Sequence, residues 1–409
     1  MSVLEVIRVA LRALWRNRLR SLLTALGVVI GVAAVIAMVA IGEGAKARVE
    51  EAFSTMGSNL LIIMPGTTTS GGAQGGHGSM PTLTWDDLKA IQTEVPSVRA
   101  AAPLLRMNTQ VLSEDQNWTT TVGGTTLDYF SIRAWRMAKG SGLTQSDIDG
   151  GAKLAVVGQT VVDKLFGPSA DPVGQTIRIR NVPFTVVGVL VKKGQSPMGM
   201  DYDDSVFVPF TTFSAKLQGG LSKYLNGMIF VGATSAEATV KAQQQISNLL
   251  RDRHGIPPGG DDDFFIRNLT EMASAQQQGT NTLTTLLASI AAVSLLVGGI
   301  GIMNIMLVSV TERTREIGLR MAVGARPRDV LLQFLVEALG LSIAGGVLGV
   351  GIGLFAAQKL AAQFGWPLLI RADIIMLSVG MSALVGVVFG LYPARRASRL
   401  DPIEALRFE

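Results

Sequence analysis

Cysteine is absent from this 409-residue sequence, and histidine occurs only at His77 and His254. Without cysteine, neither a disulfide nor a thiolate nucleophile or metal ligand can form. The two histidines lack the spacing of a metal site, and no motif places either one in a serine triad, so we expect neither kind of site. The acidic triplet Asp261-Asp262-Asp263 has no Asp-x-Asp-x-Asp-Gly loop around it, and we interpret it as a solvated turn.

Nucleotide-binding motifs are missing as well. The sequence contains no Gly-Lys dipeptide, so it cannot contain the Gly-x-x-x-x-Gly-Lys-Ser/Thr loop that binds nucleotide phosphates. We therefore expect no ATPase site, no metal and no cofactor on this chain, and we do not expect it to be an enzyme.

Charge is also scarce: 16% of the residues are charged and 48% are hydrophobic, whereas about a quarter of an ordinary soluble domain is charged. Crossing a bilayer takes about 20 apolar residues. Four windows of that kind occur, at residues 21–42, 283–310, 330–358 and 374–394. They are rich in glycine, which allows membrane helices to approach closely. The sequence predicts an α-helical membrane protein with four transmembrane helices.

The arginine distribution predicts the orientation of these spans. Residues 1–20, 311–329 and 395–409 together hold 14 arginines and no lysine, whereas the loop between the last two spans holds only Lys359 and Arg371. Basic residues concentrate in cytoplasmic segments, so both termini and residues 311–329 are expected in the cytoplasm. The net charge of +5 then reflects topology, and we expect membrane lipid rather than nucleic acid as the surroundings.

The first 20 residues carry apolar and arginine positions on separate helical faces. This pattern predicts a cytoplasmic amphipathic helix along the inner leaflet. A plain extension of the first span is the alternative.

Residues 43–281 form a large external domain of mixed α and β pattern. Strand–helix–strand units are expected at both of its ends, over residues 59–64, 84–94 and 98–113, and over residues 228–233, 235–253 and 264–268. A β-rich inserted subdomain lies between them, at about residues 125–225. The Gly/Ser-rich segment 66–79 is predicted to be disordered, or alternatively a mobile loop that contacts a partner.

The cytoplasmic loop 311–329 is expected to contain a short helix. Ile317, Met321 and Gly324 would share one face of it, with Arg313 and Arg320 elsewhere. Such an apolar knob framed by arginine fits a groove on a cytoplasmic protein, and it equally fits lipid headgroups. Glu337 is the only acid within the spans, and we predict that it pairs with a loop arginine rather than carrying protons.

Several motifs in a shared order resemble the MacB/FtsX-type permeases of ABC transporters. They are Gly27–Ile36, Gly57–Leu61, Leu165–Gly167, Asp171–Gln175, Phe184–Leu190, Arg251–His254, Thr311–Arg326, Tyr392–Ala397 and Asp401–Arg407. The resemblance covers essentially the whole chain. It implies an external domain with a porter-like fold, a permease homodimer and two copies of an ABC ATPase subunit that binds ATP and Mg²⁺.

The resemblance also assigns a role to the 311–329 loop. It implies an ATPase-coupling contact formed by Glu316, Gly318, Leu319, Met321, Gly324 and Ala325, and it favours docking over a lipid-bound helix. MacB proteins carry their ATPase ahead of the first span, where this sequence has about 20 residues, so we expect a separate ATPase subunit.

The expected function is a permease subunit in the bacterial inner membrane that exports or extracts amphipathic substrates such as drugs, peptides or lipid-linked molecules. A periplasmic adaptor and an outer-membrane channel are the expected further partners. The alternative is an ATP-driven transmembrane signalling or mechanical transmitter that activates an external partner such as a cell-wall hydrolase. An ion-coupled carrier is disfavoured, because the spans lack any carboxylate other than Glu337.

Overall fold

A computed structural model describes residues 18–57, 59–66, 69–70, 73–74, 81–196, 199–220, 222–365 and 371–407. The chain divides into two compact units. One contains Met1–Arg48 and Gln277–Glu409, and the other contains Val49–Gln276. Residues 1–17 of the predicted amphipathic helix lie outside the described residues, as does His77.

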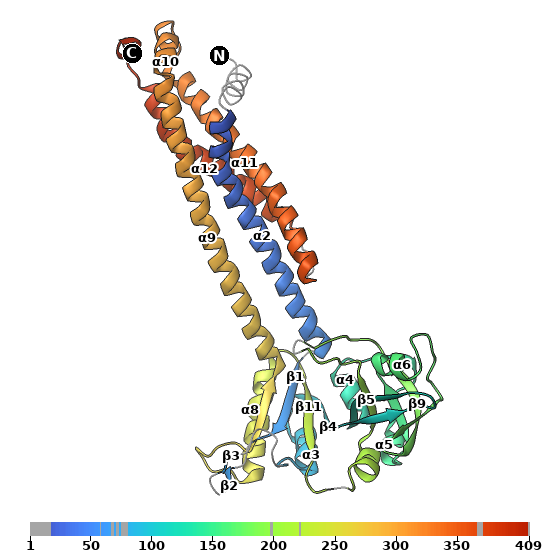
Figure 1. Cartoon of the computed structure of the whole chain (residues 1–409). Coiled ribbons are helices and arrows are strands. Elements are labelled where there is room, and N and C mark those ends of the chain that lie inside the picture. The colour runs from blue at the N-terminus through green and yellow to red at the C-terminus, as the bar shows by residue number, and fades with distance from the viewer. Residues whose placement is uncertain are drawn as a thin grey trace. The chain divides into compact units, whose positions relative to one another are not determined.

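Four long helices in the first unit are apolar enough to cross a membrane (Figure 1). They are α2 (Arg18–Met56), α9 (Leu269–Glu312), α11 (Pro327–Phe364) and α12 (Ala372–Ser398). Each contains one of the predicted windows. Two of them extend well beyond their windows, because α2 continues past Gly42 to Met56 and α9 begins at Leu269. Charged and polar residues ended the hydrophobic windows there, but Ala, Glu, Lys and Gln are good helix formers and let the helices continue.

Glycine allows these helices to touch. A Cβ on Gly27 of α2 would lie 2.8 Å from the Gly298 Cα of α9, and one on Gly349 of α11 would lie 2.8 Å from the Val29 carbonyl oxygen of α2. Ser382 of α12 donates a hydrogen bond to the Ser342 carbonyl of α11 at 2.9 Å. The glycine-rich windows therefore pack against one another as predicted.

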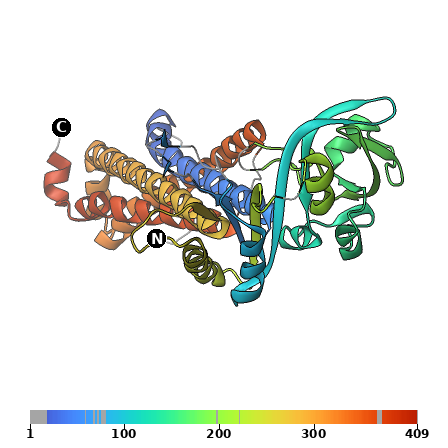
Figure 2. The same ribbon diagram turned by 90° about the horizontal axis from the view of Figure 1, so that it is seen from below.

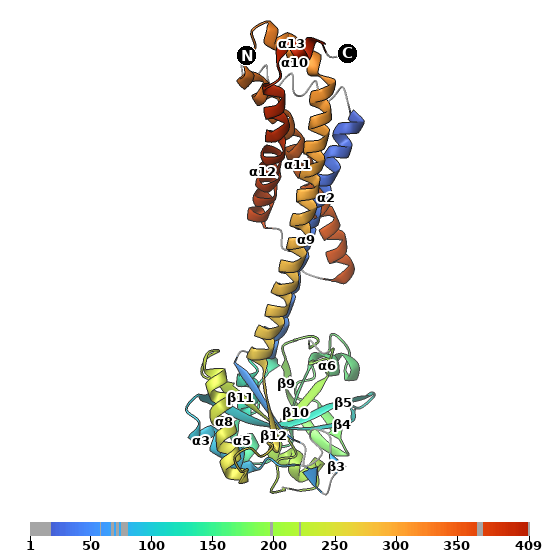
Figure 3. The same cartoon turned by 90° about the vertical axis from the view of Figure 1, so that its left-hand side faces the viewer.

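The second unit begins with four antiparallel strands in the order β12 (Phe264–Asn268), β1 (Leu60–Pro65), β11 (Gly227–Ala233) and β4 (Val98–Leu112). Helices α3 (Trp85–Glu94) and α8 (Ala238–His254) contact each other and these strands (Figure 3). Thr84 caps α3 by exchanging hydrogen bonds with Asp87, whose amide donates to the Thr84 hydroxyl at 3.1 Å. This confirms the predicted strand–helix–strand units.

The strand β4 continues out of this sheet into a second one. Its second half pairs with β5 (Asn117–Thr125), and the pairing then passes through β10 (Ser205–Pro209), β7 (Leu154–Val157), β9 (Val182–Leu190) and β8 (Thr176–Ile179) back to β4. These strands therefore close into a small barrel, with β6 (Met137–Gly140) added beside β9. Figure 2 shows β4 in cyan as one long curved strand.

The β-rich insertion consequently begins before the expected residue 125. Both β5 and the second half of β4, which pairs with it from Leu104 to Leu112, belong to the barrel. A continuous strand has no break in its sequence pattern where it leaves one sheet for another, which is why the boundary was misplaced. The turn at Arg180-Asn181 joins β8 to β9, with positive φ at both residues.

Short helices complete the barrel region. They are α4 (Leu127–Ile132), α5 (Gln145–Asp149), α6 (Gln159–Leu165), α7 (Phe210–Thr212) and the π-helical turn η1 (Phe213–Leu217). Buried aliphatic and aromatic residues, including Ile177, Phe184, Val186, Val206 and Val208, fill its core.

Two expectations for loops need correction. Within the segment predicted to be disordered, Thr69–Ser70 (β2) and Ala73–Gln74 (β3) pair as a short antiparallel ladder, while the remaining residues of 67–79 lie outside the described residues. The acidic triplet is not simply solvated, because Asp262 pairs with Arg251 and Asp263 pairs with His254. Arg251 and His254 both lie in the last turn of α8, a few residues before the triplet in sequence.

Candidate functional site

The loop between α9 and α11 contains a short helix, α10 (Thr314–Ala322). It is separated from α9 by Arg313 at its N-terminal cap position. It ends before Gly324, whose φ of +106° is a left-handed conformation that glycine adopts without strain. Pro327 occupies the first turn of α11, a position that needs no backbone N–H. The chain thus departs from helical geometry on both sides of α10, at Arg313 and at Gly324.

The inner face of α10 is covered by other elements of the same unit. Ile317 is 3% exposed and belongs to an apolar cluster that includes Val330, Phe334 and Ala397. A Cβ on Gly318 would lie 2.7 Å from the Ala405 Cβ. Ala405 belongs to the C-terminal helix α13 (Pro402–Arg407), which packs against α10 (Figure 3). Ile317 was expected on an exposed apolar knob, and this expectation is wrong because the C-terminal segment and α11 cover it.

The outer side of α10 exposes different apolar residues. Leu319 is 55% exposed and Val323 is 82% exposed. Among the six residues expected to form the contact, Glu316, Leu319 and Gly324 are exposed, Met321 and Ala325 are partly buried, and Gly318 is buried. Val323 was missed, although its position four residues after Leu319 places both on one helical face.

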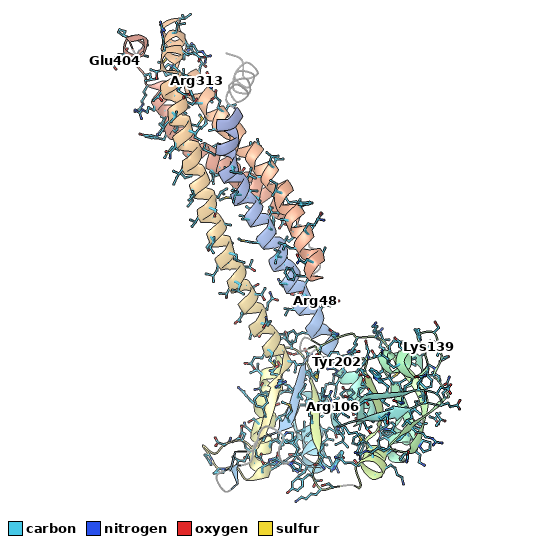
Figure 4. All side chains as sticks on the ribbon, viewed as in Figure 1. Arg48, Arg106, Lys139, Tyr202, Arg313 and Glu404 are labelled. Atoms are coloured by element: carbon cyan, nitrogen blue, oxygen red, sulfur yellow. The ribbon has the colours of Figure 1, made fainter. Side chains whose placement is uncertain are left out.

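A chain of polar side chains leads from the exposed side of α10 into the helix bundle. Arg320 donates hydrogen bonds to Glu316 at 2.6 Å and to Gln333 at 2.8 Å. The Gln333 amide lies 3.5 Å from Glu337, which also accepts from Arg313 at 3.2 Å. Gln333 and Glu337 are buried, at 5% and 3% exposed. Figure 4 labels Arg313 near the end of α9. The predicted pairing of Glu337 with a loop arginine is confirmed.

This arrangement is suited to transmitting a displacement rather than to catalysis. Leu319 and Val323 form an apolar tip that a partner's groove could enclose. Behind the tip, the charged chain fixes the position of α10 against α11, because a buried carboxylate is costly unless its hydrogen-bond partners stay in place. A shift of α10 would therefore either move α11 with it or break the hydrogen bonds among Arg320, Gln333 and Glu337.

Comparisons with protein families match both parts of the chain. Residues 21–249 match the family model of the MacB-like periplasmic core domain. Residues 288–402 match that of the FtsX-like permease C-terminal domain.

Similar proteins carry the name "Macrolide export ATP-binding/permease protein MacB". The chain is 42% identical over 98% of its length to the protein from Syntrophobacter fumaroxidans. It is 45% identical over its full length to the protein from an Azoarcus species. The chain spans 63% and 60% of these two relatives. Among solved structures, the periplasmic region of MacB from Actinobacillus actinomycetemcomitans matches 56% of the chain and 98% of that structure, with 20% identity and a TM-score of 0.45.

Proposed function

Because the chain belongs to the MacB/FtsX-type family of ABC transporter permeases, we propose that it is driven by an ABC ATPase subunit that docks on α10. The ATPase subunit binds ATP and Mg²⁺, and this chain converts the hydrolysis of ATP into movement of its external domain. The observation that supports docking most directly is the exposed pair of Leu319, on α10, and Val323, at its C-terminal cap position. The buried hydrogen-bonded side chains that end at Glu337 support it as well.

The proposed contact centres on those of the six residues expected from the sequence that are exposed in the structure. Glu316, Leu319 and Gly324 contact the ATPase subunit directly, together with Val323. Met321 and Ala325 contribute at the edge of the contact. Gly318 acts from behind, because its missing side chain lets α13 approach α10.

The proposed cargo is an amphipathic molecule such as a drug, a peptide or a lipid-linked compound, which the protein exports or extracts from the membrane. The names of the relatives, which refer to macrolide export, support export as the direction. The proposed assembly is a permease homodimer with two copies of the ATPase subunit, a periplasmic adaptor and an outer-membrane channel. Export of the cargo by movement of the large domain requires that domain to lie on the outer side of the membrane.

The proposed location is the bacterial inner membrane, with both termini and α10 in the cytoplasm and residues 43–281 in the periplasm. The 14 arginines confined to residues 1–20, 311–329 and 395–409 support this orientation. The match of residues 21–249 to a periplasmic core domain supports it as well.

The test uses the full chain in lipid nanodiscs with its cognate ATPase subunit, and measures ATP hydrolysis and co-purification of the two proteins. Leu319→Asp and Val323→Asp each place a charge in the proposed apolar contact. We expect both variants to co-purify less with the ATPase subunit and to lower the stimulation of its ATP hydrolysis about tenfold or more. Val240→Asp is the matched control, because Val240 is 52% exposed on α8 in the external unit. Wild-type stimulation and co-purification by both α10 variants would overturn the docking proposal.

A further inference from the structure

Arg133 is a buried cation whose side chain is incompletely paired. It follows α4 at the C-terminal cap position and is 3% exposed. Its Nε and Nη2 atoms are buried and have no hydrogen-bond partner within the described parts of the chain. A guanidinium keeps its charge at any physiological pH and has five N–H donors. A buried charge with unpaired donors is costly, so such a group normally has an anionic partner.

The surroundings of Arg133 add a second cation. The Lys193 ammonium donates to the Arg133 carbonyl oxygen at 2.5 Å. Burial and the charge of Arg133 lower the pKa of Lys193 to about 8, although Asp203 acts in the opposite direction. Asp203 is 1% exposed, and its two carboxylate oxygens accept from the backbone amides of Lys193 and Gly194 at 2.8 Å each. Asp203, the carboxylate that raises the pKa of Lys193, is thus already hydrogen-bonded to the backbone.

Aromatic rings hold the two cations in place. The guanidinium carbon of Arg133 lies 4.6 Å from the Tyr202 ring centroid and 5.8 Å from that of Trp135. The Lys193 ammonium lies 5.3 Å from the Trp135 ring. Such contacts compensate part of the cost of burying a cation. A ring face does not replace a hydrogen-bond acceptor in the plane of the guanidinium, so the Nε and Nη2 donors still lack an acceptor within the described residues.

The same two rings border a cavity of about 250 Å³. Tyr129 and Phe207 also line it, and both are buried members of the apolar cluster that includes Trp135. Figure 4 labels Tyr202 and Arg106, which both line this cavity.

Two acids at the edge of the cavity are already engaged. Asp201 accepts from the Thr160 hydroxyl at 2.7 Å, and Asp204 accepts from the Trp118 indole at 2.8 Å. Their charges would repel an anion from that side of the cavity. Arg133 and Lys193 do not themselves line the cavity. They contact the Trp135 and Tyr202 rings that border it, so an anion would be stabilised next to these two rings.

We propose that Arg133 and Lys193 form a binding site for an oxyanion, a carboxylate or phosphate group, carried by an amphipathic molecule. The oxyanion accepts from Nε and Nη2 of Arg133, the edge of the guanidinium that matches two oxygens of one group. The apolar part of the molecule lies in the adjacent cavity against Tyr129 and Phe207. The site lies wholly within the external unit and does not depend on docking of an ATPase subunit.

The experiment measures binding to the purified full chain in dodecyl maltoside by isothermal titration calorimetry. The probes are inorganic phosphate, acetate and dodecyl phosphate added to the maltoside micelles. Arg133→Met removes the charge and keeps a chain of similar length, and we expect it to weaken binding of dodecyl phosphate at least tenfold. Arg136→Met is the matched control, because Arg136 is an exposed arginine three residues along the chain, and it should retain wild-type affinity within about twofold.

The probes separate two sources of the oxyanion. Arg133-dependent binding of dodecyl phosphate, with weaker binding of the two small anions, supports an amphipathic ligand. Equal Arg133-dependent binding of inorganic phosphate retains the oxyanion site and overturns the amphipathic part of the proposal. The site itself is refuted if no probe binds, or if Arg136→Met weakens binding as much as Arg133→Met.

Thermal unfolding without any probe supplies a second, independent readout. Replacing an unpaired buried charge by an apolar side chain should raise the unfolding midpoint of Arg133→Met above that of the wild type. Added dodecyl phosphate should raise the midpoint of the wild type and leave that of the variant unchanged. A lower midpoint for Arg133→Met without probe would show that Arg133 is already satisfied within the protein. If Arg133→Met does not fold, Lys193→Met takes its place in the binding measurement with the same expected loss.

Discussion

The Arg313 guanidinium donates a hydrogen bond to the Glu337 carboxylate at 3.2 Å. Arg313 precedes α10, and Glu337 lies about three turns into α11, where it is 3% exposed. The pair therefore joins the only described short helix between α9 and α11 to the interior of a membrane-spanning helix. Removing either member would leave the other without its main charged partner.

We expect Arg313→Met to destabilise the protein by about 3–5 kcal/mol, the usual effect of leaving a buried charge without its partner. The double variant Arg313→Met/Glu337→Leu should recover most of that loss, since both charges are then absent. Thermal unfolding in detergent of the wild type, both single variants and the double variant measures the coupling between the two residues. Additive effects of the two single changes would show that the pair does not act as a unit.

Gln333 should separate binding of an ATPase subunit from coupling to it. It is buried and connects Arg320 of α10 to Glu337 of α11. Gln333→Leu keeps a side chain of similar size and removes this connection, so we expect normal co-purification with the ATPase subunit. Stimulation of ATP hydrolysis should fall about threefold or more, within the range of coupling energies carried by such networks. Gln358→Leu is the matched control, because Gln358 is an exposed glutamine of the same helix, and it should keep wild-type stimulation. Equal stimulation by the wild type and Gln333→Leu would argue against transmission through Gln333.

Gly318→Ala should disturb the packing of α13 on α10. The added methyl group would lie 2.7 Å from the Ala405 Cβ, and overpacking of this kind costs about 1–3 kcal/mol. Trypsin cleavage near the arginines at the end of α12 should become faster. Ala405→Gly in the same chain removes the opposing methyl group and should restore the wild-type cleavage rate. Failure of this second change to rescue would place the defect elsewhere.

The His254 imidazole lies between two carboxylates, 2.7 Å from Asp263 and 3.1 Å from Asp87. The hydrogen bond with Asp87 outweighs burial and, with Asp263, raises the pKa of His254 to about 9. The folded state therefore holds a proton that the unfolded chain loses near pH 6.5. This stabilisation is fully present below pH 6.5 and is lost as the pH rises through 9.

We expect the free energy of unfolding to decrease by about 1–2 kcal/mol between pH 7 and pH 10 relative to His254→Asn, allowing for partial exposure of the cluster. Lys193 has the opposite effect, since a lowered pKa in the folded state makes that state more favourable above pH 8. Lys193 is present in both proteins, so its contribution cancels in the comparison. Chemical unfolding at several pH values is the measurement, and parallel curves for the two proteins would contradict the expectation.

The absence of native cysteine makes single-cysteine labelling a clean test of orientation. Glu114 is exposed in the turn between β4 and β5, and Arg315 is exposed on α10. In spheroplasts, Glu114→Cys should react with a membrane-impermeant maleimide, and Arg315→Cys should react only after permeabilisation. The reversed pattern would invert the proposed topology.

Hydropathy identified the four spans because each was a long apolar run with at most one charged residue, and glycine density correctly indicated close helix packing. The partner of Glu337 was also predictable, since a single acid among apolar residues needs a nearby base and the arginine-rich loop is next to it in sequence. These predictions rest on local composition, which a single window of sequence contains.

Contacts between distant segments were not predictable in this way. The periodicity of Ile317 and Met321 located an apolar face of α10, but only the fold shows that α11 and the C-terminal segment cover Ile317. The bridge from His254 to Asp87 joins residues 167 positions apart, and nothing in the spacing of either residue indicates it. The unpaired donors of Arg133 likewise became visible only once its neighbours were placed.

Strand β4 is shared by the four-stranded sheet and the barrel, pairing with β11 from Val98 to Leu105 and with β5 from Leu104 to Leu112. The two sheets therefore should not melt one after the other, because losing either set of partners exposes half of a strand that the other sheet needs. Excising the barrel as a module would leave an unpaired edge prone to aggregation. The external unit is thus expected to unfold cooperatively, and chimaeras should be joined outside residues 98–112.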